Sequence, residues 1–393
     1  MKKLKVFEAF SGVGSQSMSL RNIGCNFEVV GISEVDRYAL LSYDSIHNNN
    51  ETVEEKNKED MLNEMKVKNI GYNFSTGKSE IPKNEKDIKK LYEAHIRSKN
   101  FGDIRLINPN ELPEFDLFTY SFPCKNISVA GKQGGAIEGS GTQSSLIWDC
   151  KGIIKVKKPK YLMMENVKNL VSKSHIHTLN MWCEELEKLG YKNYLPENGY
   201  LNGKEFNVPQ HRERVILISI RNDVEEEFSF PVGKGCNISV RDILETENIP
   251  SNLLIPNEQL IPTTLVDSKE YLSITKDSKL IYVSSLNIKG NESMKRVYLD
   301  KGLCPTLNSM NGGNRQPKIM ICNNDNEGYT LRKLTPLECW RVMGFSDEDF
   351  IKAKNAGLPN SKLYERAGRG IVVPMLEEIF KNLLGEYIEK NNQ

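Results

Sequence analysis

The order of apolar and polar positions predicts strands that alternate with helices over the first part of the chain. The apolar run "LKVFEAFSG" ends in a small turn, and "SQSMSLRNIGC" after it has apolar residues at helical spacing up to Gly24. Further strand patterns are "FEVVGISEVD", "FDLFTYSF", "YLMMENV" and "RVILISI". This alternation indicates a doubly wound α/β domain with a mostly parallel sheet, which binds its ligand at the carboxyl ends of the strands.

Two segments interrupt this alternation and define the predicted domains. Between about 52 and 100 the chain is dense in Lys, Glu and Asn, which predicts a partly helical, solvated insertion. Later, short apolar runs such as "KLIYVSSL" and "KRVYL" alternate with turn-rich stretches, which predicts a smaller strand-rich domain. We therefore expect an α/β domain over 1–225, a strand-rich domain over 226–345, and a segment over 346–393 that returns to the α/β domain.

Composition removes several alternatives. The eight cysteines form no CxxC pair and no cluster with histidine at zinc spacing, which argues against a disulfide framework and a metal site. No apolar stretch approaches the roughly 18 residues of a membrane span, and the amino terminus lacks a targeting pattern. We expect a soluble, cytoplasmic protein with reduced thiols. The formal net charge of +1 means that any basic binding surface is local.

The first turn has features of a nucleotide site. In "VFEAFSGVGSQ", Gly12 and Gly14 allow close approach of the backbone to a ligand, and Glu34 ends the second strand, where it can accept hydrogen bonds from ribose hydroxyls. The third glycine of the dinucleotide fingerprint is missing. This stretch alone leaves a structural turn and a nicotinamide cofactor open.

Four reactive groups follow later strands. Cys124 comes directly after a proline in "TYSFPCKNISVAGKQGG", Glu165 lies among apolar neighbours in "MMENV", and Arg212 and Arg214 stand two apart in "PQHRERV". A thiol is a candidate nucleophile, a buried carboxyl is a candidate proton donor, and guanidinium groups bind oxygen acceptors. Each group also has an ordinary structural interpretation. Their succession at the predicted carboxyl ends of strands favours chemistry.

These stretches together resemble the DNA (cytosine-5) methyltransferase family. The resemblance rests on nine segments in the order of the family: "FEAFSGVGSQ", "SEVD", "FGDI", "SFPCKNISVAGKQGG", "GTQSSLIWD", "MMENVKNL", "NVPQHRERV", "RKLTPLECWRVMGF" and "GRGIVVPML". It implies the Rossmann-like fold of S-adenosylmethionine-dependent methyltransferases, with the strand-rich segment as the target-recognition domain.

The resemblance implies S-adenosylmethionine as the cofactor. Glu34 would hold the ribose and Asp103 the adenine amino group. The cofactor-binding residues implied in this way are Phe10, Gly12, Gly14, Glu34, Val35, Asp103, Ile104, Pro123, Leu146, Gly370 and Ile371.

The resemblance also assigns the chemistry. Cys124 would add to carbon 6 of a cytosine flipped out of the duplex, which makes carbon 5 nucleophilic toward the methyl group. Glu165 would contact the ring nitrogen and the exocyclic amine, Arg214 the ring carbonyl, and Arg212 would support Arg214. Double-stranded DNA is the expected partner, and the candidate DNA contacts are Lys125, Ser128, Gln210, Arg296, Thr306 and Arg315.

Three departures from the family pattern keep alternatives open. Lys125 stands where the family has glutamine, Gln143 where it often has arginine, and 368–370 reads Gly-Arg-Gly in place of a Gly-Asn-Ser type sequence. A catalytically silent DNA-binding paralogue therefore stays open. An RNA cytosine-5 methyltransferase is the nearest alternative, although the Cys-Phe-Thr motif of the tRNA-modifying branch is missing. We expect a monomer that is functionally paired with a restriction endonuclease, or acts alone.

Overall fold

The chain folds into two compact units. A computed structural model describes residues 2–49, 51–73, 76–123, 143–310, 314–323 and 328–388. Unit 1 comprises Met1–Leu201, Glu213–Pro231 and Leu376–Gln393, and unit 2 comprises Asn202–Arg212 and Val232–Met375. The roles predicted for 1–225, 226–345 and 346–393 stay predictions, but the compact units divide the chain at other positions. Residues 346–375 belong to unit 2.

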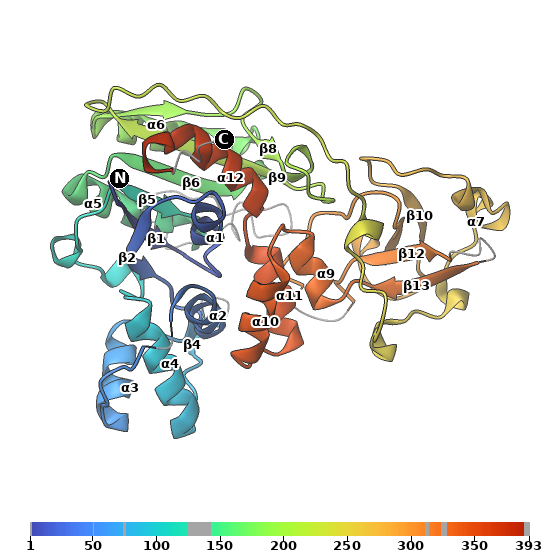
Figure 1. Ribbon diagram of the computed structural model, residues 1–393, viewed down its shortest axis with the longest axis horizontal. Coiled ribbons are helices and arrows are strands. Elements are labelled where there is room, and N and C mark those ends of the chain that lie inside the picture. Colours follow the sequence, from blue (N-terminus) through green and yellow to red (C-terminus); the bar gives the residue numbers. More distant parts are fainter. Residues whose placement is uncertain are drawn as a thin grey trace. The chain divides into compact units, whose positions relative to one another are not determined.

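Unit 1 is built on a mostly parallel sheet with the strand order β2-β1-β5-β6-β9-β7 (Figure 1). β1, β2, β5 and β6 pair in parallel, whereas β9 runs antiparallel to both of its neighbours. The prediction of a mostly parallel sheet is confirmed. The strands of unit 1 are β1 (Leu4–Ala9), β2 (Phe27–Ser33), β5 (Leu117–Tyr120), β6 (Tyr161–Val167), β7 (Tyr191–Tyr194) and β9 (Glu213–Arg221), and β8 (Leu201–Asn202) stands where the chain passes into unit 2.

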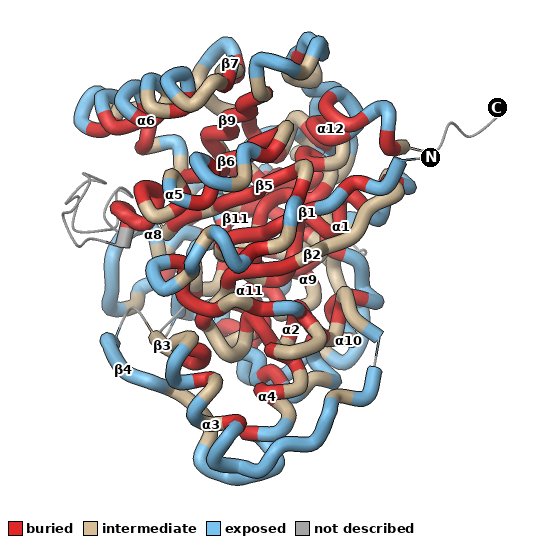
Figure 2. The backbone as a smooth tube through the Cα atoms, turned by 90° about the vertical axis from the view of Figure 1, so that its left-hand side faces the viewer, coloured by how far each residue is buried: buried red, intermediate tan, exposed pale blue. Residues whose placement is uncertain are grey.

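Helices cover both faces of this sheet, as expected for a doubly wound fold (Figure 2). On one face, α5 (Ile147–Lys157) and α6 (Ile176–Lys188) bury apolar residues against the aromatic side chains of β1 and β5, and Trp182 Nε1 donates to the Tyr120 hydroxyl at 3.1 Å. On the other face lie α1 (Ser15–Asn22) and α12 (Val373–Leu383), which are joined by a hydrogen bond from Asn22 Nδ2 to Glu377 Oε1.

The predicted insertion is helical, but one side of it is buried. It contains α3 (Lys58–Val67), the hairpin β3 (Tyr72–Asn73) and β4 (Lys78–Ser79), and α4 (Glu85–Arg97), next to α2 (Arg37–His47). Apolar residues of both insertion helices share one core with β2 and α2, namely Ile32, Leu40, Tyr43, Met61, Met65, Ile70, Ile88, Leu91, Tyr92 and Ala94. The many Lys and Glu residues occupy only the outer faces of the helices, which is why composition alone predicted a solvated segment.

Unit 2 contains the predicted strand-rich segment. Its sheet has the order β10-β11-β12-β13, and the predicted strands in "KLIYVSSL" and "KRVYL" are confirmed as β10 and β11. α9 begins at Pro336, and Thr335 and Glu338 form a capping box at its start. The elements are β10 (Tyr282–Ser285), β11 (Arg296–Leu299), β12 (Lys318–Cys322), β13 (Tyr329–Lys333), α7 (Thr264–Asp267), α8 (Glu292–Lys295), α9 (Pro336–Arg341), α10 (Asp347–Asn355) and α11 (Asn360–Arg369).

The helices of the described residues are all short. None of them combines the length and the apolar character that are needed to cross a lipid bilayer.

Candidate active site

The turn after β1 exposes its backbone at the carboxyl edge of the sheet. Phe10, Gly12 and Gly14 all have positive φ angles, of 55°, 58° and 77°. A Cβ atom at Gly14 would lie 2.3 Å from His47 Nε2, so only glycine fits there. At Gly12 the only described neighbour of an added Cβ is the Phe10 carbonyl, 4.0 Å away. The turn therefore leaves room for a ligand beside Gly12.

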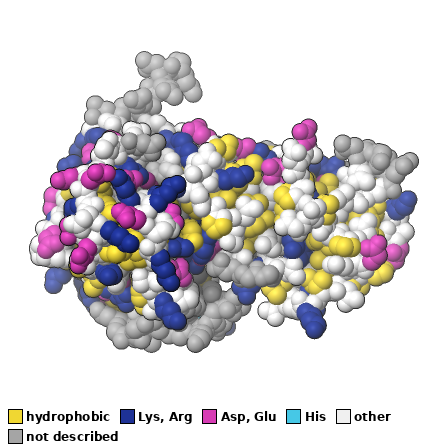
Figure 3. Space-filling view, turned by 90° about the horizontal axis from the view of Figure 1, so that it is seen from below, with side chains coloured by type: hydrophobic (Ala, Val, Ile, Leu, Met, Phe, Trp, Pro, Cys, Tyr) yellow, Lys and Arg dark blue, Asp and Glu magenta, His cyan; other side chains and the backbone are white. Residues whose placement is uncertain are grey.

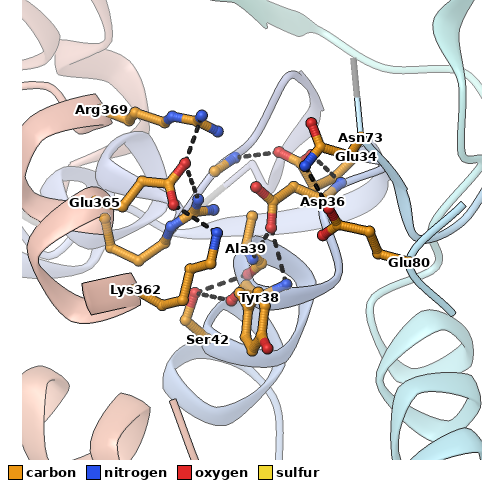
Figure 4. A network of polar contacts seen from close by, with 12 residues as sticks. Glu34, Asp36, Tyr38, Ala39, Ser42, Asn73, Glu80, Lys362, Glu365 and Arg369 are labelled. Carbon is orange, nitrogen blue, oxygen red and sulfur yellow. Dashed lines mark hydrogen bonds and ion pairs between the residues drawn. The ribbon is translucent and has the colours of Figure 1, made fainter. Parts of the chain in front are cut away.

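Glu34, which directly follows β2, binds the backbone of this turn through its carboxylate. Its carboxylate accepts backbone hydrogen bonds from Gly12 at 3.0 Å and from Val35 and Asp36 at 2.8 Å. Figure 4 shows Glu34 beside Asp36, whose own carboxylate caps the first turn of α2. The side chain of Asn100 accepts from the Glu34 amide and donates to the Glu34 carbonyl, at 3.0 and 2.9 Å. Glu34 is thus held in one orientation from both sides.

Asp103 is the second carboxylate of this region and is completely buried. Oδ1 accepts from the backbone and Nε of Arg105 at 3.1 and 2.9 Å, and Oδ2 accepts from Asn69 Nδ2 at 2.9 Å and from Arg105 Nη2 at 2.5 Å. Burial by itself would raise the pKa of Asp103, but the hydrogen bonds from Arg105 and Asn69 outweigh it, and the pKa is lowered. Asp103 is therefore an ionised acceptor at neutral pH.

Two buried hydroxyl groups lie at the ends of the neighbouring strands β1 and β5. Ser11 Oγ and Ser121 Oγ have no hydrogen-bond partner among the described residues. Buried hydroxyls are normally hydrogen-bonded, so two such groups at one edge of a sheet fit a polar ligand that binds there. Ile104 and Leu146, which were also predicted to bind the cofactor, are buried in the same apolar core of unit 1. The carboxylates and hydroxyl groups at this edge suit a polar ligand.

Glu165 and Arg214 form an ion pair at the same edge of the sheet. Arg214 Nε lies 3.0 Å from Glu165 Oε1, and both side chains are about nine-tenths buried. The pairing register of β6 and β9 brings them together, because Val167 at the end of β6 faces Arg214 at the start of β9. The sequence pattern predicted that the arginines follow the carboxyl end of a strand. Instead, Arg212 precedes β9 and Arg214 is its second residue, and Arg214 reaches this edge only because β9 is antiparallel.

The residues before Cys124 are held next to this ion pair. Asn166, the neighbour of Glu165, donates from Nδ2 to the Phe122 carbonyl at 3.1 Å, and Ser144 donates to the Pro123 carbonyl at 2.8 Å. Cys124, Lys125 and Ser128 lie outside the described residues, as does the side chain of Gln143. The start of the cysteine-bearing segment is therefore anchored to both β6 and the region before α5.

Arg212 and Gln210 have a different environment from Arg214. Arg212 is 1% exposed and donates to the carbonyls of Leu307, Gly368 and Gly370 at 2.8 to 2.9 Å, all within unit 2. Gln210 is completely buried; its oxygen accepts from the Leu307 amide at 3.1 Å. Its Nε2 donates to the Val342 carbonyl. The side chain of Gln210 therefore exposes no surface for the predicted contact with DNA.

The other predicted residues of unit 2 are more accessible. Arg296, Thr306 and Arg315 are exposed, and the Thr306 hydroxyl donates to the His211 carbonyl at 2.5 Å. The Gly-Arg-Gly departure closes α11, where Arg369 pairs with Glu365 one turn earlier (Figure 4). Gly370 and Ile371 follow at this helix end.

Sequence reasoning missed four side chains that hold the predicted ones: Asn69, Asn100, Arg105 and Asn166. Three of them adjoin predicted motifs, since Asn100 and Arg105 flank "FGDI" and Asn166 follows Glu165. Their positions next to these motifs were the only sequence signal that could have identified these three residues. Asn69 is 34 residues from Asp103 and had none.

The fold is that of the cytosine-5 methyltransferases. The structure of S. pombe Dnmt2 methyltransferase superimposes with a TM-score of 0.57, covering 98% of this chain and 99% of that one, at 15% identity. The family described as C-5 cytosine-specific DNA methylase matches residues 68–385, and the chain belongs to it.

Two relatives carry this assignment over nearly the whole length. The type II methyltransferase M2.ScrFI of Lactococcus lactis subsp. cremoris is 41% identical, covering 97% of this chain and 99% of the relative. The orphan methyltransferase M.SPBetaI of Bacillus phage SPbeta is 30% identical, with both chains fully covered. The chain is therefore an enzyme that methylates carbon 5 of cytosine in DNA.

Proposed function

We propose that this enzyme transfers a methyl group from S-adenosylmethionine to a cytosine flipped out of duplex DNA, with Cys124 as the nucleophile. The observation that carries the proposal is the anchoring of Phe122 by Asn166, directly beside the Glu165–Arg214 ion pair. This contact ties the strand end that leads to Cys124 to a carboxylate and a guanidinium. A thiol, a carboxylate and a guanidinium together can activate, orient and polarise a pyrimidine ring.

The raised pKa values of the seven other cysteines support Cys124 as the nucleophile. Burial raises the pKa of the Cys25 and Cys183 thiols to about 11, and it also raises the pKa values of Cys150, Cys236, Cys304, Cys322 and Cys339. The thiolate is the reactive form, so burial disfavours the reactive form of each of these seven side chains, and this supports Cys124 as the candidate nucleophile.

In the proposed reaction the Cys124 thiolate forms a bond to carbon 6 of the cytosine, and the electron pair of the double bond moves toward carbon 5. Glu165, in its protonated form, donates a hydrogen bond or its proton to the ring nitrogen, where the negative charge accumulates, and also contacts the exocyclic amine. Bound S-adenosylmethionine supplies the methyl group on a sulfonium centre. A base then removes the proton from carbon 5, which restores the double bond and expels the thiolate.

Arg214 orients Glu165 for this contact. Its Nε lies 3.0 Å from Oε1 of Glu165, and this contact holds the carboxyl group in one direction. The predicted contact of Arg214 with the ring carbonyl uses the same guanidinium group, whose planar set of donors can serve a carboxylate and a carbonyl together. We therefore propose that Glu165 and Arg214 act on the base as a pair.

The cofactor fits the residues of the first turn. We propose that Glu34 accepts from the ribose, that Asp103 accepts from the adenine amino group, and that the backbone around Gly12 lies against the ligand. The buried hydroxyls of Ser11 and Ser121, which lack partners among the described residues, support a polar ligand at this edge. The contributions of Gly370 and Ile371 stay predictions from the family resemblance.

For the substrate we propose duplex DNA, read by unit 2. Exposed Arg296, Thr306 and Arg315 are suited to phosphates and base edges. The relatives named above include both a type II and an orphan methyltransferase, so pairing with a restriction endonuclease is a proposal about function in the cell and requires no physical contact.

Conversion sequencing of plasmid DNA from a host that expresses the protein tests the proposal. We expect 5-methylcytosine at one short recurring sequence, abolished by Cys124→Ala. The matched control is Cys183→Ala, which removes a half-buried thiol of high pKa and should leave methylation intact. Methylation that persists in Cys124→Ala contradicts the nucleophile. Soluble protein that methylates RNA but no DNA contradicts the substrate.

A further inference from the structure

Within the insertion, the end of α3 lies against Asp103, the predicted adenine-binding carboxylate. Asn69 follows α3 in the left-handed conformation, with φ of 55°, and its Nδ2 donates to Asp103 Oδ2 at 2.9 Å. The preceding Lys68 carbonyl accepts from the Asp103 amide at 3.0 Å. A Cβ atom on Gly102 would lie 2.2 Å from that carbonyl, so the two segments are in direct backbone contact. The end of α3 thus fixes both the backbone and the side chain of Asp103.

The buried core of the insertion keeps this helix end in place. The Ile70 amide donates to the Met65 carbonyl at 2.8 Å, and both side chains are fully buried next to β2 and α2. An asparagine in the left-handed conformation is a common helix terminus, and the hydrogen bond to Asp103 holds its side chain. Asn69 is therefore a rigid donor.

Arg105 is the other donor to Asp103 and differs in its freedom. It makes three of the four hydrogen bonds that the carboxylate accepts, and its side chain is 41% exposed. A carboxylate has about four acceptor positions, so those of Asp103 are all occupied in this structure. A ligand amine can bind Asp103 only if one donor leaves, and the exposed guanidinium of Arg105 is the donor that can move.

We propose that Asn69 is a positioning residue for adenine recognition, and that the adenine amino group displaces Nη2 of Arg105 from Asp103 Oδ2. The inference rests on the proposed function, because it deepens the role of Asp103 in cofactor binding. It also gives the insertion a role in the site, since the insertion holds an adenine-reading carboxylate at a fixed angle with a neutral donor that adds no competing charge.

The rest of the insertion agrees with this role. Asn100, at the carboxyl-terminal end of the insertion, holds the backbone of Glu34 through two hydrogen bonds, so each predicted cofactor carboxylate is supported by one asparagine of the insertion. Figure 3 looks onto the insertion from below and shows Lys and Arg interspersed with Asp and Glu. Ion pairs such as Lys89 with Glu55 and Lys56 with Glu64 account for this mixture. A mixed surface of this kind gives no basic stripe for nucleic acid.

The test compares two ligands by calorimetry on the full chain: S-adenosylhomocysteine and its analogue that lacks the 6-amino group. The variant is Asn69→Gly, because glycine keeps the left-handed backbone and removes only the amide. We expect the unaltered protein to prefer the amino compound by about tenfold or more, as for a hydrogen bond to a charged group. Asn69→Gly should lose most of that preference while its affinity for the analogue stays the same.

The matched control is Asn84→Gly, which removes the side-chain cap of α4 in the same insertion. It should lower stability and leave the preference for the amino compound unchanged. An equal loss of preference in Asn84→Gly, or an unchanged preference in Asn69→Gly, overturns the inference.

Arg105→Met tests the displaced donor. Removal of the competing guanidinium should tighten binding of the amino compound several-fold; weaker binding, to the extent seen in Asp103→Asn, shows instead that Arg105 holds the ligand and overturns the displacement. The failure of the proposed function is distinguishable: it appears as no binding of either compound by the unaltered protein, or as equal binding of both.

Discussion

Two regions separated by a single residue use a buried arginine in opposite ways. Arg212 donates to three neutral carbonyls, which join the segments around Leu307 and Gly368 to its own segment within unit 2. Arg214, at the start of β9 in unit 1, pairs with the carboxylate of Glu165. The sequence shows the same residue type twice, on one side of an extended stretch.

The difference teaches that the partner, and not the residue type, decides the role. A guanidinium surrounded by carbonyls has its donors used for holding the chain together, so its removal should cost stability. A guanidinium beside a carboxylate at a ligand edge sets the orientation and charge of that carboxylate, so its removal should cost activity. We therefore interpret Arg212 as a structural residue that holds three backbone segments together, and Arg214 as a candidate member of the active site.

The largest effect is expected for Arg214→Ala. The rate of methyl transfer should fall by about a thousandfold, equivalent to about 4 kcal/mol, because Glu165 loses the cation that orients it. Single-turnover methylation of a DNA containing the target sequence measures the effect. Arg221→Ala, at the opposite end of β9, is the control and should retain the rate. A loss of less than tenfold in Arg214→Ala would show that Arg214, like Arg212, has a structural role.

Arg212→Met should lower the free energy of unfolding by about 3 to 4 kcal/mol, because three carbonyls lose a charged donor in a buried place. Urea denaturation measures this change. Exposed Arg315→Met should shift the midpoint by very little. If Arg212→Met is as stable as the unaltered protein but inactive, the structural role of Arg212 is contradicted, and Arg212 acts in the active site as Arg214 does.

Glu8 sharpens the comparison, because it is a fully buried carboxylate that forms no salt bridge with any described residue. Burial raises its pKa to about 7, although hydrogen bonds from Tyr43 and Ser17 oppose this effect. The folded state therefore binds the proton more tightly than the unfolded state does. The contribution of Glu8 to the free energy of unfolding is therefore highest at acid pH. It falls by up to about 3 kcal/mol as the pH rises from about 4.5 through 7, because Glu8 must then ionise inside the fold or keep a proton that the unfolded chain has lost.

Glu8→Gln should remove that pH dependence. We expect the variant to gain stability relative to the unaltered protein at pH 8 and to show no gain at pH 5, measured by thermal unfolding at both values. Glu165→Gln is the paired comparison, since its carboxylate has Arg214 as a counter-ion and should not gain stability at pH 8. A parallel pH profile for Glu8→Gln and the unaltered protein would contradict the prediction.

The smallest effect concerns the close approach beside Arg212. A Cβ atom at Gly368 would lie 1.7 Å from the Asn308 carbonyl oxygen, so Gly368→Ala forces two backbone segments apart and should cost about 2 kcal/mol. Differential scanning calorimetry measures it. Gly152→Ala, in α5 where an added Cβ meets no described atom, should instead stabilise the protein slightly. An equal change of stability in the two variants would show that the backbone segments at Gly368 and Asn308 are loosely packed.

Much of unit 1 could be predicted from the sequence, because its signals are local. The strands "YLMMENV" and "FEVVGIS" were recognised from short runs rich in apolar residues. The insertion was harder, because its charged residues lie outside and its apolar residues meet partners from β2 and α2. Composition describes the outer surface of such a segment and not its core.

The sequence by itself determined the family and the mostly parallel sheet, because these depend on residue types in a fixed order, and it supplied the candidates for the chemistry, which stay predictions. Only the tertiary structure decided which arginine meets Glu165, since that follows from the antiparallel direction of β9. It alone brought Asn69 to Asp103 across 34 residues. Such contacts depend on strand direction and on packing between distant segments, which no local pattern of polar and apolar residues encodes.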